Sequence, residues 1–296
     1  MHKNKLSFLV SGGSVPGSDH TAPLRRSNCQ DAFGVLQSDD IVVAVVADGN
    51  GSEPNSEVGA KLGASLMLNM LSTHLTRCVG RFLEGMNASD AACLFRQAIR
   101  RAEQDMLSQI RVLANALVPS GGSFSETVKQ NFLFTLLGAI VTKDWSGVFY
   151  VGDGVYALNG EVTRLGPFTE NKPPYPAYQL FSTEDYDSDS PLVRANLGIV
   201  VPTEDVDSIL IGTDGVEHLI AAEESKLSGR SDAVGPLSQF WENSQFVENS
   251  DAIRRRLALI TKESNSATLG KGGVALLNTE PGLLKDDTTI VVFQRH

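Results

Sequence analysis

Three runs of strand-forming apolar residues end in an aspartate followed by a glycine, and a fourth run begins directly after a pair of aspartates. VVAVVADG, GVFYVGDG and SILIGTDG contain Asp48, Asp153 and Asp214, and the pair Asp286 and Asp287 precedes TTIVVF. Runs so rich in Val, Ile, Leu and Phe are typical of buried strands, so each carboxylate is expected where a strand leaves the core. Because an unpaired buried charge is costly, the recurrence predicts that these acids are paired or bind metal at a shared site.

Carboxylates that cluster without His or Cys form an all-oxygen site. Such a site suits Mg²⁺ or Mn²⁺ better than Zn²⁺. Asp-Gly is also an ordinary turn dipeptide, and any one of these pairs taken alone is better explained as a turn. The prediction of a metal site therefore depends on the strand ends converging.

The composition is that of a globular protein. With 296 residues, 42% apolar and 20% charged, the chain can bury a large core, and we expect residues 1–296 to form one domain. Apolar runs are shorter than the roughly 20 residues of a membrane span, and LSFLV is too short for a signal-peptide core. The net charge of −10 argues against a nucleic-acid partner, and neither feature predicts a membrane partner.

The three cysteines, Cys29, Cys78 and Cys93, match no zinc or redox spacing. An odd number without such spacing fits a reducing compartment, so we expect a cytoplasmic protein.

The order of predicted elements indicates an α+β fold. Strands are expected at 5–11, 31–36 and 41–48, followed by helices from 57 to about 75 and from 88 to 117, the second capped by Ser89 or Asp90. Further strands are expected in NFLFTLLGAIVT, GVFYVG, VYALNGEVTRL, LGIVV, SILIG and the C-terminal run, with helices at 216–224 and 249–262. Asn159-Gly160 predicts a two-residue hairpin turn and hence antiparallel strands. The pattern predicts a layered sandwich.

A long loop is predicted between two of these strands, at residues 166–196. It carries four prolines, at 167, 173, 174 and 176, and the aromatic residues Tyr175, Tyr178 and Phe181. Restricted backbone with large contact area suits a recognition element for protein substrates, although a loop that merely packs on the sheet is the alternative.

The ordered motifs CQDAF, VADGNGS, FTLLGAIV, VGDG, GTDGV and DDTTIVV resemble those of the metal-dependent, type 2C-like serine/threonine protein phosphatases. The resemblance extends from about residue 14 to 293, and SVPGSDH followed by CQDAF is similar to the bacterial branch. It implies an αββα four-layer sandwich of two antiparallel sheets flanked by helix pairs. It also implies hydrolysis of phosphoserine and phosphothreonine in proteins by a metal-activated water, with phosphorylated proteins made by an opposing serine/threonine kinase as partners.

The resemblance also assigns metal ligands. Asp48 would bridge two Mn²⁺ or Mg²⁺ ions, the Gly49 carbonyl would join one of them, and Asp214 and Asp286 would complete the other. Asp31 would hold metal-bound waters, and Asp153 with Asp214 would hold a third, weaker ion. The catalytic set is therefore Asp31, Asp48, Asp214 and Asp286.

Several positions depart from the family pattern. Asn50 stands where many relatives have a histidine proposed as general acid, and Gln30 stands where some have a ligating glutamate. Arg26 has the spacing of the phosphate-binding arginine, with Arg25 and His20 as rivals; a surface arginine and a histidine that caps the first loop are the structural alternatives. Asn50 and Gln30 also support the alternative function, a catalytically silent sensor or binding module with the phosphatase fold.

Overall fold

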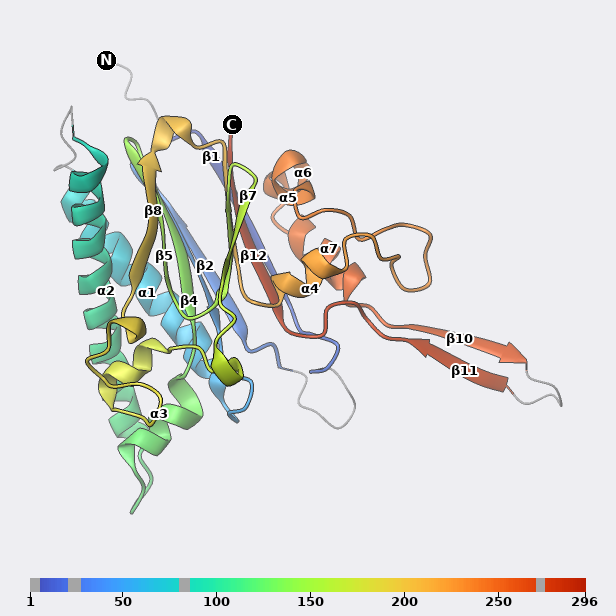
Figure 1. Cartoon of the computed structure of the whole chain (residues 1–296), viewed down its shortest axis with the longest axis horizontal. Coiled ribbons are helices and arrows are strands. Elements are labelled where there is room, and N and C mark those ends of the chain that lie inside the picture. The colour runs from blue at the N-terminus through green and yellow to red at the C-terminus, as the bar shows by residue number, and fades with distance from the viewer. Residues whose placement is uncertain (1–5, 21–27, 80–85, 270–274) are drawn as a thin grey trace.

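Two five-stranded antiparallel sheets lie face to face, with helices on both outer faces (Figure 1). The computed structural model describes residues 6–20, 28–79, 86–269 and 275–296. The first sheet has the order β2 (Asp31–Gln37), β3 (Ile41–Asp48), β4 (Leu136–Thr142), β5 (Trp145–Val151) and β8 (Asn196–Pro202). The second has the order β1 (Phe8–Val15), β12 (Thr288–Arg295), β9 (Ser208–Gly212), β6 (Gly154–Leu158) and β7 (Glu161–Leu165).

Each sheet is covered by its own set of helices. The first sheet is covered by α1 (Ser56–Val79), α2 (Ala88–Leu117) and α3 (Phe124–Phe132), and the second by α4 (Val216–Ala221), α5 (Gln239–Glu242), α6 (Gln245–Glu248) and α7 (Ala252–Ile260). The arrangement confirms the predicted αββα sandwich. No described helix is long and apolar enough to cross a membrane.

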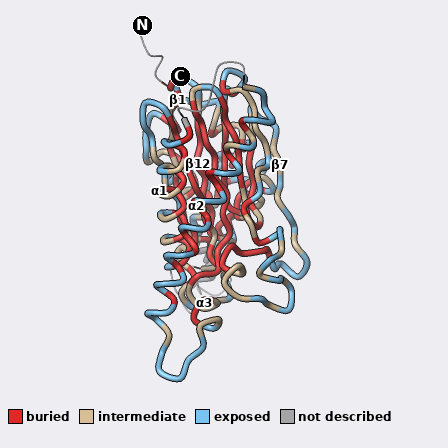
Figure 2. Tube along the Cα trace, turned by 90° about the vertical axis from the view of Figure 1, so that its left-hand side faces the viewer, coloured by how far each residue is buried: buried red, intermediate tan, exposed pale blue. Residues whose placement is uncertain are grey.

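The apolar core forms three layers: one between the sheets and one beneath each set of helices. Strand β3 shows why its sequence is apolar throughout. Ile41, Val43 and Val45 pack toward the helices, whereas Val42, Ala44 and Val46 pack toward the second sheet. Since both faces of the strand are buried, no position calls for a polar residue until Asp48. Figure 2 shows that burial is concentrated in the strands at the centre of the molecule.

The helix α2 and the β6–β7 hairpin occur where the sequence predicted them. The hairpin turn has positive φ at both Asn159 (49°) and Gly160 (87°), as a two-residue turn between twisted strands requires. The cap of α2 was predicted wrongly: the side chain of Asn87, one residue before the helix, accepts from the Asp90 backbone N–H at 3.0 Å.

Other boundaries differ from the prediction. The first strand is β1, Phe8–Val15, and not 5–11. The apolar segment NFLF does not begin a strand, because its first two residues end helix α3. That helix begins with Ser123 as N-cap and Glu126 three residues later, a capping-box pattern visible in the sequence.

Besides α3, two described features had no sequence prediction. One is the short pair α5 and α6; the other is the hairpin of β10 (Ser264–Leu269) and β11 (Ala275–Glu280), which projects away from the sandwich in Figure 1. The 166–196 loop contains three short 3₁₀ helices, η1 (Thr169–Asn171), η2 (Pro176–Leu180) and η3 (Pro191–Val193), and η4 (Thr203–Asp205) follows β8.

Candidate active site

Four aspartates from the two sheets line one pocket of about 600 Å³ at one end of the sandwich. They are Asp48, Asp153, Asp214 and Asp286, and Gly49 and His20 line the same pocket. We call it the acid pocket. Of the remaining predicted site residues, Asp31 lies buried beside Asp48, and Arg26 lies outside the described residues.

Strand register places Asp31 and Asp48 together. They are directly opposite in the β2–β3 pair, and the Asp48 carbonyl accepts the Thr135 N–H at 2.8 Å where β3 ends. The next residue must be small, because a Cβ on Gly49 would lie 2.7 Å from the Ser56 carbonyl oxygen. The chain therefore turns tightly after β3, and the Asp48 side chain reaches the pocket.

Thr213 joins the acids of the first sheet to the second sheet. Its hydroxyl donates to Asp31 Oδ2 at 2.7 Å and accepts the Thr289 N–H at 3.1 Å. Asp214 follows directly, and Asp286 lies two residues before β12. One hydroxyl thus fixes the orientation of Asp31 relative to the strand ends that carry Asp214 and Asp286.

Asp287 has a structural role that was not predicted from the sequence. Its side chain is 2% exposed and accepts the backbone N–H groups of Gly17, at 2.8 Å, and Gln30. His20 lies against the same acids, with Nδ1 3.0 Å from Asp287 Oδ1 and Nε2 3.6 Å from Asp286 Oδ1. Asp287 therefore joins the loop after β1 to the segment before β2, and it sets His20 at the pocket wall.

Burial and the charges of neighbouring aspartates raise the pKa of Asp31, Asp48, Asp153 and Asp214. Burial raises the pKa of Asp31 to about 8, of Asp214 to about 7 and of Asp153 to about 6. The pKa of Asp48 is raised well above its usual range, by burial first and then by the charges of four neighbouring aspartates. The charged form of this cluster is therefore unfavourable without positive charge nearby.

The side chains fit a hard divalent cation. The donors are carboxylate oxygens, and no donor among the described residues reaches the buried Oδ1 of Asp31. As they stand, no three His, Cys, Asp or Glu side chains in the described ranges are close enough together to enclose one ion. The carboxylates instead lie around the wall of the pocket.

The two departures from the family pattern both lie at the pocket wall. The Asn50 side-chain oxygen accepts from the Ser52 N–H at 3.2 Å and from the Ser52 hydroxyl at 2.9 Å. The Gln30 amide donates to the Ser56 hydroxyl at 2.6 Å. Both side chains thus order the turn after β3 and supply no charge to the pocket.

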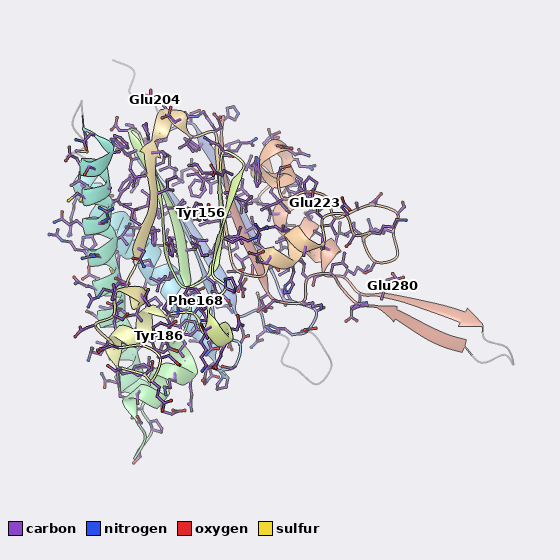
Figure 3. All side chains as sticks on the ribbon, in the orientation of Figure 1. Tyr156, Phe168, Tyr186, Glu204, Glu223 and Glu280 are labelled. Atoms are coloured by element: carbon purple, nitrogen blue, oxygen red, sulfur yellow. The ribbon has the colours of Figure 1, made fainter. Side chains whose placement is uncertain are left out.

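Several residues of the pocket wall were not predicted from the sequence. Lys129 comes from α3, and the 166–196 loop contributes Glu170, Lys172 and Asp185 beside Tyr175 and Tyr178, which the sequence had singled out. Lys129 could not be placed because α3 was not predicted; the Ser123–Glu126 capping pattern was the signal that could have found it. Figure 3 places Phe168 and Tyr186 of the loop at the same end of the sandwich.

Comparison with known proteins gives a family and a fold. Residues 21–258 match the family described as protein phosphatase 2C. The serine-threonine phosphatase 2C from Toxoplasma gondii superposes with a TM-score of 0.58 at 12% identity, covering 99% of this chain and 96% of that one. The serine/threonine phosphatase Stp1 from Staphylococcus aureus superposes with a TM-score of 0.51 at 13% identity, covering 100% and 98%. None of the curated proteins matches significantly.

Proposed function

The chain belongs to the protein phosphatase 2C family, and on this premise we propose that the acid pocket hydrolyses phosphoserine and phosphothreonine in proteins. The observation that carries the proposal is the convergence of Asp48, Asp153, Asp214 and Asp286, from distant parts of the sequence, in a single pocket. The family match includes the first three of these acids.

We propose that the pocket holds two Mn²⁺ or Mg²⁺ ions. Asp48, the Gly49 carbonyl, Asp214 and Asp286 would hold them, and Asp153 with Asp214 would hold a third, weaker ion. When bound, such ions neutralise charge on phosphoryl oxygens and lower the pKa of a water that attacks phosphorus.

The chain's own groups orient the acids and the phosphate. Thr213 fixes Asp31 by donating to Oδ2, which leaves Oδ1 to accept a hydrogen bond, as its proposed part in holding metal-bound waters requires. Arg26 or His20 is proposed to bind the phosphate, and Lys129 and Lys172 add positive charge to the wall. Asn50 has no titratable proton, so it cannot protonate the leaving serine or threonine oxygen.

The substrate is proposed to be a protein phosphorylated by an opposing serine/threonine kinase. The 166–196 loop forms part of the pocket wall, which supports its part in recognising such substrates. A cytoplasmic location stays a prediction.

The test is hydrolysis of a phosphoserine peptide and of p-nitrophenyl phosphate with Mn²⁺, with Mg²⁺ and with chelator. We expect turnover of both substrates with metal and none with chelator. The matched control is Asp144→Asn, since Asp144 is an exposed acid at the opposite end of the first sheet and should be dispensable. Metal binding without turnover of either substrate would favour the silent sensor, which Asn50 and Gln30 support.

A further inference from the structure

Glu103 is a buried acid outside the acid pocket. It lies on α2 and is 2% exposed. Its Oε1 accepts two hydrogen bonds, one from the Gln179 side-chain amide at 3.0 Å and one from the Ala195 backbone N–H at 2.8 Å. Gln179 lies in the middle of the 166–196 loop and Ala195 at its end, so one oxygen atom joins two parts of the loop to the helix.

The Gln179 amide makes a further bond within the loop. Its Nε2 also donates to the Val193 carbonyl at 2.9 Å. Helix α2, η2 and η3 are therefore joined through the side chains of Glu103 and Gln179.

The residue beside Gln179 carries this constraint toward the acid pocket. Tyr178 lines the pocket, and its ring packs against Tyr175 at 5.4 Å and Tyr186 at 5.6 Å between centroids. The Tyr186 hydroxyl donates to the Lys172 carbonyl at 3.0 Å. Tyr175 and Lys172 line the pocket as well, so the joined segment includes the loop's part of the pocket wall.

Replacing Glu103 by an apolar residue would remove the acceptor for both N–H groups. A buried donor without an acceptor loses its bonds to water and gains nothing in exchange. The Gln179 side-chain amide and the Ala195 N–H could then replace their lost hydrogen bonds only if the loop moved away from α2.

We propose that Glu103 is a positioning residue for phosphoprotein substrates: it holds the 166–196 loop on α2 so that Lys172, Tyr175 and Tyr178 stay at the wall of the acid pocket. Glu103 touches neither the acids nor the phosphate, so it acts through the loop. Its effect on substrates rests on the proposed function, whereas its effect on the loop does not.

The test compares Glu103→Leu with Glu103→Gln. The glutamine keeps Oε1 as an acceptor, whereas leucine fills a similar volume without one. For Glu103→Leu we expect the KM for a phosphoprotein to rise about tenfold, as the loss of one to two buried hydrogen bonds allows, while kcat/KM for p-nitrophenyl phosphate stays within about twofold. Glu103→Gln should restore the phosphoprotein KM.

A second readout needs no activity. Hydrogen exchange of residues 172–195 should quicken in Glu103→Leu and not in Glu103→Gln. Gln179→Leu removes the donor from the loop side and should behave like Glu103→Leu, which covers the case in which the leucine at 103 prevents folding. Asp105→Asn is the matched control, because this acid lies on the same helix and contacts His74, not the loop.

Unchanged exchange in both leucine variants would overturn the proposal, as would an equal loss of activity on both substrates. A wild type that hydrolyses neither substrate would overturn the proposed function. In that case the exchange experiment would still show whether Glu103 holds the loop.

Discussion

At the scale of single residues, Asp48 lies at the centre of the repulsion in the acid pocket. Besides burial, the charges of Asp31, Asp214, Asp286 and Asp153 all raise its pKa. A side chain that is selected for stability alone would not be placed among four like charges. The same arrangement is favourable once cations share the pocket.

Asp48→Asn should therefore lower activity and raise the stability of the metal-free protein. The amide keeps the shape of the side chain but removes a charge, so metal-dependent turnover should fall by orders of magnitude. Because the folded pKa of Asp48 is raised, its charge costs stability as the pH rises, and asparagine removes that cost. Thermal unfolding in chelator should give the variant the higher Tm, with a gap that widens from pH 5 to pH 8. Near-normal turnover, or a lower Tm throughout, would refute the assignment of Asp48.

Glu103 gives a second pH-dependent prediction. Burial raises its pKa from 4.5 to about 7, against the opposing effects of its hydrogen bonds and of Arg194 and Arg100. The folded state then holds the proton more tightly than the unfolded state, so the contribution of Glu103 to stability is full below pH 4.5 and is lost as the pH rises through 7.

The glutamine of Glu103→Gln does not titrate. The free energy of unfolding of this variant should therefore rise relative to that of the wild type between pH 5 and pH 8. The shift corresponds to a relative gain on the order of 3 kcal/mol in the free energy of unfolding, measured by urea denaturation. A difference between variant and wild type that is constant with pH would show that Glu103 keeps an ordinary pKa.

At the scale of elements, the sequence predicted those helices, strands and turns whose own residues carry a clear local pattern. The long apolar runs, the amphipathic helix α2 and the Asn159-Gly160 turn each carry their own signal, and all three occur in the structure. Helix α3 was missed because Phe132 and Leu133 continue into the apolar strand β4, so no polar break marks the boundary. The β10–β11 hairpin was missed because SNSATL lacks a continuous apolar run.

The 166–196 loop carries a prediction of its own. Residues 183–189 lie between the parts of the loop that Glu103 holds, and replacing them with a short Gly-Ser link leaves Gln179 and Ala195 in place. The change removes Asp185, which lines the acid pocket, and Tyr186, which packs on Tyr178. We expect kcat/KM for a phosphoprotein to change while hydrolysis of p-nitrophenyl phosphate is nearly intact, since a small substrate needs only the acids. Equal loss of both activities, or no change in either, would show that the loop has no part in recognition.

At the scale of the whole molecule, the site exists only because both sheets end at the same edge. The sequence predicted this convergence of Asp48, Asp153, Asp214 and Asp286 from their recurrence at strand ends, and the acid pocket contains all four. It could not predict Lys129, Lys172 and Asp185 at the wall or the hydrogen bonds of Asp287, because these depend on how distant segments pack. The role of the acids as metal ligands stays a proposal.

Metal binding should stabilise the whole fold, because the proposed ligands come from both sheets. At a free Mn²⁺ concentration of 100 times Kd, a single site adds about 2.7 kcal/mol to the free energy of unfolding. We expect the Tm to rise with Mn²⁺ in the wild type and in Asp144→Asn, and to stay flat in Asp48→Asn. An equal rise in all three proteins would place the bound metal elsewhere.

The most direct test of the central claim is anomalous X-ray diffraction from crystals soaked in Mn²⁺, recorded above and below the manganese absorption edge. The acid pocket should contain two anomalous peaks within ligand distance of the Asp48 carboxylate, with Asp214 and Asp286 on one of them. Crystals of Asp48→Asn should lose at least one peak. A wild-type acid pocket without anomalous density at saturating Mn²⁺ would contradict the claim that these strand-end acids form a metal centre.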